Sequence, residues 1–109
     1  MSDLTDKHCK SAGEGLTLLE RDQIHGLLRQ LNGWELDARG TQISRKYQFR
    51  DYYHTIAFVN ALAWIAHRED HHPDLEVYYN CCLVRYSTHA VSGLTENDFI
   101  CAAKVDALL

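Results

Sequence analysis

Hydrophobic and polar positions follow two different periods along this chain, one typical of helices and one typical of strands. Between residues 18 and 31, leucine and isoleucine recur at spacings of three and four, which predicts an amphipathic helix. Thr17 and Glu20 have the spacing of a capping box at the start of this helix. An Asn-Gly pair at residues 32–33 is expected to end it.

Two later regions show the alternation typical of strands with one solvated face. Residues 34–37 and 41–49 flank a short turn, and in the second run Ile43, Tyr47 and Phe49 alternate with polar residues, so a hairpin is predicted. Residues 75–79 and 82–88, around a turn near Asn80, predict a second hairpin.

A second helix is predicted between these hairpins. Asp51 is a plausible N-cap, and the apolar residues that follow it recur with helical spacing. Phe58, Trp64 and Ile65 widen the apolar surface beyond one face, which suggests a contact between subunits. Because Pro73 disfavours a helical residue before it, this helix should end near His71.

A last helix is predicted after Thr95, which has Asp98 at the third helical position. The order is therefore helix, hairpin, helix, hairpin, helix. This order favours an α+β fold, with a four-stranded antiparallel sheet and three helices packed on one face. We expect residues 1–15, which are polar and aperiodic, to be a flexible leader and residues 16–109 to form a single domain.

Composition and charge exclude several classes of function. The chain has 109 residues, 11 basic and 15 acidic side chains and a net charge of −4, which argues against a nucleic-acid binder. It contains no apolar run long enough for a membrane span. The four cysteines form no CxxC pair, so reduced thiols and a cytoplasmic location are expected.

Two polar islands carry the candidate chemistry. Residues 67–74 hold three histidines and three carboxylates, and histidine exchanges protons near neutral pH. Ser87, Thr88 and His89 end the fourth predicted strand. A proton-transfer site is one interpretation of the first island, and a solvated, charged helix end is the other.

Histidine spacing also permits a metal-site hypothesis. His67 and His71 are four residues apart, on one face of a helix, and His89 or Cys81 would complete a tetrahedral set. The sequence has no HExxH motif, and histidine pairs at this spacing are common by chance.

The combination of motifs resembles the pterin-4a-carbinolamine dehydratase family. The resemblance covers about residues 16–109 and rests on Asp70-His71-His72-Pro73, Ser87-Thr88-His89 and the later Gly93-Leu94-Thr95 with Asp98. It implies the same α+β fold, assembled as homodimers or homotetramers. It also implies a lyase that dehydrates 4a-hydroxytetrahydrobiopterin to quinonoid dihydropterin and so recycles the pterin cofactor of aromatic amino-acid hydroxylases.

The resemblance implies a site without a metal or an organic cofactor. His71, His72 and His89 are the expected catalytic residues, with His71 and His89 as the proton-transfer pair and His72 orienting the pterin. Asp70, Ser87 and Thr88 join these three histidines as expected substrate-binding residues. His67 stands where many family members have glutamate, which makes it an expected modulator of catalysis.

The resemblance also sets the expected partners. They are the pterin, further copies of this chain and, by functional coupling, an aromatic amino-acid hydroxylase. The alternative function is a module that binds another protein, as some animal relatives do when they act as dimerisation cofactors of a transcription factor.

Overall fold

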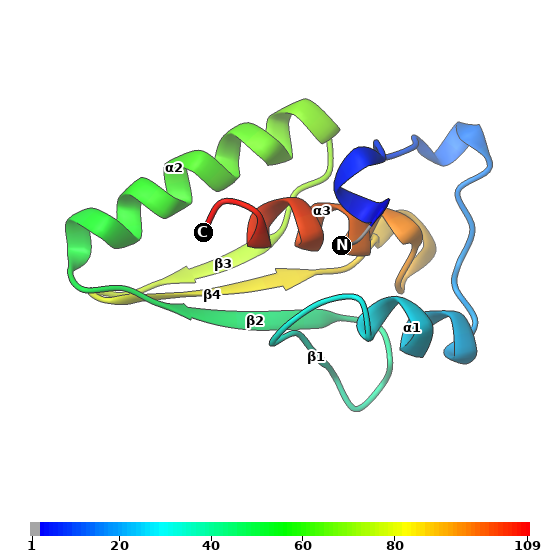
Figure 1. The fold of residues 1–109 in the computed structure, drawn as a ribbon. Helices are drawn as coiled ribbons and strands as arrows, with labels where there is room; N and C mark the ends of the chain where they lie inside the picture. The colour runs from blue at the N-terminus through cyan, green and yellow to red at the C-terminus, as the bar shows by residue number, and fades with distance from the viewer. Residues whose placement is uncertain (1–2) are drawn as a thin grey trace.

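The computed structural model describes residues 3–109 and contains one four-stranded antiparallel sheet with three α-helices. The sheet order is β1-β2-β4-β3. Helices α2 and α3 lie along one face of this sheet (Figure 1), and α1 contributes Ile24 to the same core. The predicted α+β class is therefore confirmed. The elements are β1 Glu35–Leu36, β2 Ile43–Gln48, β3 Asp74–Val77, β4 Cys81–Tyr86, α1 Arg21–Leu28, α2 Tyr52–Glu69 and α3 Glu96–Asp106.

Alternating side chains of the two central strands build the core. Strands β2 and β4 pair from Ile43 opposite Tyr86 to Gln48 opposite Cys81. One face of this pair supplies buried side chains to the hydrophobic core, namely Ile43, Tyr47, Cys82, Val84 and Tyr86. Lys46 on the other face is exposed. Both predicted hairpins are confirmed, because β1 pairs with β2 and β3 pairs with β4.

Helix α2 begins and ends close to the predicted positions. The Asp51 side chain accepts a hydrogen bond from the backbone N–H of His54 at 2.9 Å, as an N-cap does. The helix ends at Glu69, and Asp70 adopts the left-handed conformation with φ of 49°. Aspartate tolerates this conformation better than most residues, so the chain turns out of the helix immediately before His71.

Helix α1 begins later than the capping box at Thr17 predicted. It starts at Arg21, and the N–H of Glu20 donates to Oε1 of Gln23 at 2.8 Å. The residues before it are extended, because the N–H of Leu19 donates to the carbonyl of Leu94 at 2.9 Å. That contact with a distant part of the chain outweighs the local helical pattern.

Residues 3–15, which we call the N-terminal segment, lie in the stretch expected to be a flexible leader and contact the rest of the protein. This segment contains two 3-10 turns, Asp3–Asp6 and Ala12–Glu14, and the first of them packs against α3 (Figure 1). Leu4 is only 1% exposed and belongs to the hydrophobic core. One buried leucine docks a segment whose other residues are mostly polar. Residues 1–2 of the expected leader lie outside the described residues.

Candidate functional site

The two polar islands meet at one cleft of about 320 Å³. All six residues expected to bind the substrate line it: Asp70, His71, His72, Ser87, Thr88 and His89.

The sheet register explains why these islands meet. Strand β3 runs antiparallel to β4, with Asp74 opposite Arg85. Residues 71–73 precede β3 and residues 87–89 follow β4, so both groups lie at the same end of the sheet. Islands that are far apart along the chain are thereby brought together by the second hairpin.

His71 is the most constrained of the three expected catalytic histidines. Its Nε2 lies 2.6 Å from Oδ1 of Asp98, and the exposed fractions of the two side chains are 11% and 0%. Its ring lies parallel to the ring of Tyr86, with 5.7 Å between centroids and 5° between planes. A carboxylate on one ring nitrogen fixes both the tautomer and the orientation of an imidazole, which leaves Nδ1 as the nitrogen free for substrate.

Asp98 is itself held by a buried network of hydroxyl and amide donors. Its Oδ2 accepts from the Thr88 hydroxyl at 2.8 Å and from the backbone N–H of Thr95 at 3.0 Å. The hydroxyls of Thr88 and Thr95 lie 2.8 Å apart. Because Thr88 is only 5% exposed, its hydroxyl supports the Asp98 carboxylate, which in turn orients His71.

The role of Asp98 as a partner of His71 was not predicted. The sequence indicates Asp98 only as a capping residue at the start of the last helix, and the structure confirms that bond to Thr95. A carboxylate has two oxygens, and the second one reaches across to His71. The spacing of residues gives no signal for that contact.

His72 and His89 are exposed and line the cleft, His72 from the segment before β3 and His89 from the segment after β4. His89 begins a short 3-10 turn, His89–Val91, immediately after Thr88. Ser87, Thr88 and His89 also line a neighbouring cavity of about 330 Å³ together with Asp37 and Arg39. Residues 87–89 therefore border two cavities. Only the cleft of about 320 Å³ is lined by all three histidines.

The expected modulator His67 lies elsewhere. It is exposed, its ring stacks on Trp64 with 5.8 Å between centroids, and it is absent from the residues that line the cleft. The helix ends at Glu69, so the helical spacing assumed between His67 and His71 does not continue to His71. The structure thus separates His67 from the other histidines.

The residues expected to bind a metal ion are not arranged around one point. Within residues 3–109, no group of three or more His, Cys, Asp or Glu side chains is arranged to hold a metal ion. Cys81 begins β4 and His89 follows the end of that strand, so these two expected ligands are at opposite ends of it. His67 and His71 are also divided by the end of α2.

The cysteines behave as structural residues. All four are free, and Cys81, Cys82 and Cys101 are buried, which confirms the core positions expected for Cys82 and Cys101. Burial, with a smaller contribution from Cys81, raises the pKa of Cys82 to about 11. A thiol with this pKa is a poor nucleophile at neutral pH.

The N-terminal segment contributes to the cleft, which the sequence analysis did not predict. Lys10 and Ser11 line it, as does Leu16 immediately after the segment, and Asn97 lines it from α3. The sequence of residues 1–15 is mostly polar, and the apolar residues that dock the segment, Leu4 and Cys9, form no periodic pattern, so this role was not predicted.

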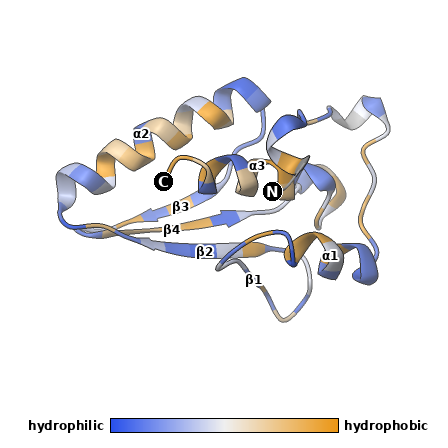
Figure 2. Cartoon of the chain, in the orientation of Figure 1, coloured by the Kyte–Doolittle hydropathy of each residue, from blue (hydrophilic) through white to orange (hydrophobic). Residues whose placement is uncertain are grey.

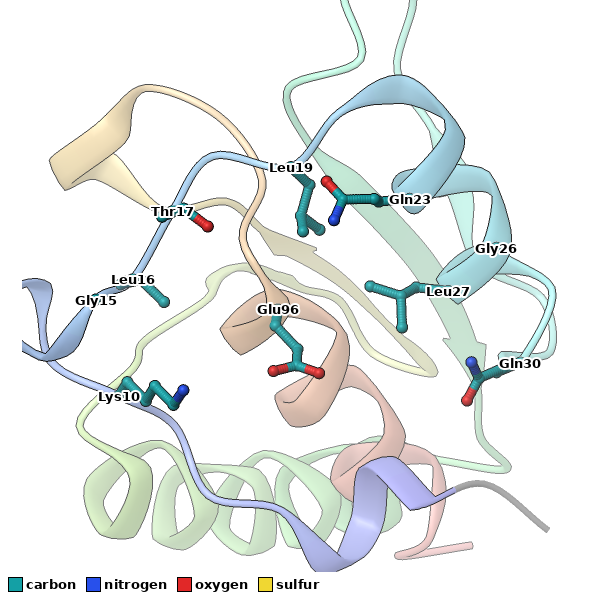
Figure 3. Close-up of a pocket in the computed structure, with 10 residues that line it drawn as sticks. All are labelled: Lys10, Gly15, Leu16, Thr17, Leu19, Gln23, Gly26, Leu27, Gln30 and Glu96. Carbon is teal, nitrogen blue, oxygen red and sulfur yellow. The ribbon is translucent and has the colours of Figure 1, made fainter.

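A larger cavity of about 510 Å³ lies between the N-terminal segment, α1 and the start of α3 (Figure 3). Leu19 and Leu27 face it from one side, and Lys10 and Glu96 face it from the other (Figure 3). None of the expected site residues lines it. Its size alone does not make it the catalytic site, because no histidine borders it.

Comparison with known proteins gives a consistent family. The family model described as Pterin 4 alpha carbinolamine dehydratase matches residues 17–108. Two relatives have names that include pterin-4-alpha-carbinolamine dehydratase. The protein from Nitrosomonas eutropha is 55% identical, and the match covers 98% of this chain and 94% of that protein. The protein from Legionella pneumophila strain Corby is 56% identical, and the match covers 99% of this chain and 96% of that protein.

Solved structures agree with these relatives. A crystal structure from Brucella melitensis, described as a transcriptional coactivator/pterin dehydratase, has a TM-score of 0.81 and 32% identity, and covers 84% of this chain and 98% of that one. A pterin dehydratase-like protein described as a RuBisCO assembly factor has a TM-score of 0.62 and 24% identity over 71% of this chain and 89% of that one. The second likeness shows the fold alone.

Proposed function

The chain belongs to the pterin-4-alpha-carbinolamine dehydratase family, and on that premise we propose that it dehydrates 4a-hydroxytetrahydrobiopterin by general acid–base catalysis with His71 and His89. The observation that supports this proposal is that residues of both polar islands line one cleft. His71 and His72 are distant from His89 along the chain, yet all three border one cavity. The size of this cavity, about 320 Å³, suits a bicyclic ring.

The reaction requires two proton transfers and no redox step. The 4a-hydroxyl leaves as water after its oxygen takes up a proton, and N5 of the pterin then gives its proton to a base, which leaves the quinonoid dihydropterin. Two imidazoles suffice for these transfers, because one donates while the other accepts. Positioned general acids and bases typically accelerate such steps by about 10²–10⁴-fold.

The surroundings of the three histidines support unequal roles for them in this proposal. Asp98 and Tyr86 hold His71 in one orientation, which suits a group that must meet a proton at a fixed atom. His89 lines the same cleft from the segment that follows β4, so the pair brackets the substrate. His72, which is exposed and adjacent to Pro73, orients the pterin, with contacts from Asp70 and Ser87.

The chemistry of the substrate and the product indicates which reactions precede and follow this dehydration. The substrate is the hydroxylated pterin that a pterin-dependent aromatic amino-acid hydroxylase releases, and the product must be reduced before that cofactor is used again. We therefore assign the protein to pterin recycling, without a metal or organic cofactor of its own. The free thiols support a cytoplasmic location. Among the helices of residues 3–109, none is long and apolar enough to cross a membrane.

A stopped-flow assay tests this function. The 4a-hydroxytetrahydropterin is generated in place by a hydroxylase, and the formation of quinonoid dihydropterin is followed by absorbance with and without the protein. We expect the protein to accelerate dehydration well beyond the spontaneous rate. A rate equal to the uncatalysed one would refute the proposal.

We also propose that copies of this chain associate as a homodimer or homotetramer through α2. Of the three residues expected at such a contact, Phe58 is buried and Ile65 packs on the core, and only Trp64, which is 60% exposed, remains available. Tyr53, 79% exposed, lies three helical turns earlier on the same face. Figure 2 shows further hydrophobic residues along α2.

Sedimentation of the wild type and of Trp64→Glu tests this association. We expect a dimer or tetramer that shifts toward monomer in the variant, and a monomeric wild type would contradict it. The alternative, a module for binding a foreign transcription factor, is not favoured, because the assembled histidine cleft has no role in such a module.

A further inference from the structure

Buried polar side chains anchor the N-terminal segment to the rest of the protein. The Glu69 side chain, which is 4% exposed, accepts a hydrogen bond from the backbone N–H of Cys9 at 2.8 Å and lies 3.0 Å from Nδ1 of His8. Lys104 of α3 donates to the carbonyl of Thr5 at 2.9 Å. Such groups are costly to bury without partners, so the docked position of the segment is specified by the body of the protein.

Asn97 makes the attachment closest to the cleft. Its Oδ1 accepts from the N–H of Lys10 at 3.0 Å, and its Nδ2 donates to the carbonyl of the same residue at 2.8 Å. The Asn97 side chain therefore satisfies both backbone groups of Lys10, as a neighbouring strand would. Asn97 is only 3% exposed, so its amide group is shielded from water.

The attachment sets the position of one side of the cleft. Lys10 and Ser11 border the same cavity as His71, His72 and His89. We propose that the N-terminal segment is a wall of the catalytic cleft that determines its affinity for substrate, and that Asn97 is the positioning residue that holds this wall in place. This inference rests on the proposed function and adds residues that the two histidine islands do not include.

A pair of thiols offers a way to fix the segment independently of Asn97. Sγ of Cys9 lies 3.4 Å from Sγ of Cys101 in α3, and a disulfide requires these atoms to approach to about 2.05 Å. The hydrogen bond to Cys101 and burial raise the pKa of Cys9 well above its usual value. Cys9 is therefore a thiol at neutral pH, and joining it to Cys101 requires an added oxidant.

The first part of the test is a kinetic comparison of three proteins. Asn97→Ala removes both bonds to Lys10, and we expect KM to rise about tenfold while kcat stays within about twofold, since a wall contributes equally to ground-state and transition-state binding. Lys104→Met removes the bond to Thr5 and does not border the cleft. We expect it to raise KM about threefold, which covers the case in which Asn97→Ala does not fold.

The second part is a rescue by cross-linking. Diamide takes two electrons and two protons from the Cys9 and Cys101 thiols and becomes the hydrazine as the S–S bond forms. In Asn97→Ala or Lys104→Met, we expect the cross-link, verified by peptide mass, to return KM to within about twofold of wild type, and a reductant to raise it again. Adding Cys101→Ser to either variant should remove the rescue.

The outcomes separate this inference from the proposed function. If wild type does not accelerate dehydration, the proposed function fails, and the inference is then judged by the binding of 7,8-dihydrobiopterin to the same variants. If wild type is active but both variants keep the wild-type KM, the wall does not contribute to affinity. If the cross-link forms and KM stays raised, Asn97 acts without the segment. Either of the last two results overturns the inference.

Discussion

The imidazole of His71 and the carboxylate of Asp98 lie 2.6 Å apart, although 27 residues separate them in the chain. The same carboxylate caps α3 through the N–H of Thr95. A group that stabilises the start of a helix therefore also orients an imidazole of the candidate site. Because Asp98 makes both contacts, the orientation of His71 in the cleft depends on the position of α3 in the core.

Replacing Asp98 by asparagine tests this orienting role. The amide cannot accept from His71, Thr88 and Thr95 as a carboxylate does, so we expect kcat to fall by about 10- to 100-fold through the loss of a fixed His71 orientation. The measurement is steady-state dehydration kinetics on protein whose folding is verified by circular dichroism.

Asp106 provides a matched control for this change. It is also an α3 carboxylate, and it accepts hydrogen bonds from Trp34 and Tyr47 and pairs with Arg45, away from the cleft. Asp106→Asn should lower stability and leave kcat within about twofold of wild type. Equal losses of kcat in both variants would show that Asp98 acts through stability alone.

His67 should be dispensable for catalysis. Its ring contacts Trp64 on the exposed surface, outside the cleft, so His67→Ala should change kcat/KM by less than about twofold. The pH profile of the rate should also be unchanged. A shifted profile would restore His67 as a modulator.

Leu4 should contribute strongly to stability despite its place near the start of the chain. It is 1% exposed, and its truncation to alanine removes buried methyl groups and leaves a cavity, which costs about 2–3 kcal/mol. Urea unfolding measures this difference. Leu109→Ala, at a leucine that is 71% exposed, should cost less than about 0.5 kcal/mol. Similar small costs at both positions would contradict the docking of the N-terminal segment.

Acidification should loosen the N-terminal segment through Glu69. Burial alone would raise the pKa of this carboxyl, but the N–H of Cys9, the His8 imidazole and the charge of Lys104 outweigh it and lower the pKa below 4.5. The stabilisation is therefore present above pH 4.5 and is lost as the pH falls through the lower folded value. Hydrogen exchange at the Cys9 amide, corrected for its intrinsic rate, should show less protection at about pH 3 than at about pH 6.

Glu69→Gln separates this effect from general acid unfolding. The amide oxygen still accepts from Cys9 but does not titrate in this range, so the Cys9 amide should show the same protection at both pH values. If wild type also shows no change, the Glu69 contact does not hold the segment.

Local sequence patterns predict most of the fold, and the family resemblance predicts six of the residues that line the cleft. Both miss features that depend on long-range contacts. Asp51 and Thr95 cap their helices as predicted, because capping depends on residues within one turn. Helix α1 starts later than predicted because the N–H of Leu19 donates to the carbonyl of Leu94. Leu4 and the Asp98 contact to His71 were missed for the same reason, since neither belongs to a periodic pattern.

The rate of a single dehydration turnover in His71→Ala and His89→Ala tests the central claim most directly. Each imidazole is assigned a proton transfer at the same cleft, so each variant should lose at least about tenfold in rate while keeping the wild-type circular dichroism spectrum. His67→Ala serves as the histidine control and should retain the full rate. Wild-type rates in both His71→Ala and His89→Ala would contradict the account.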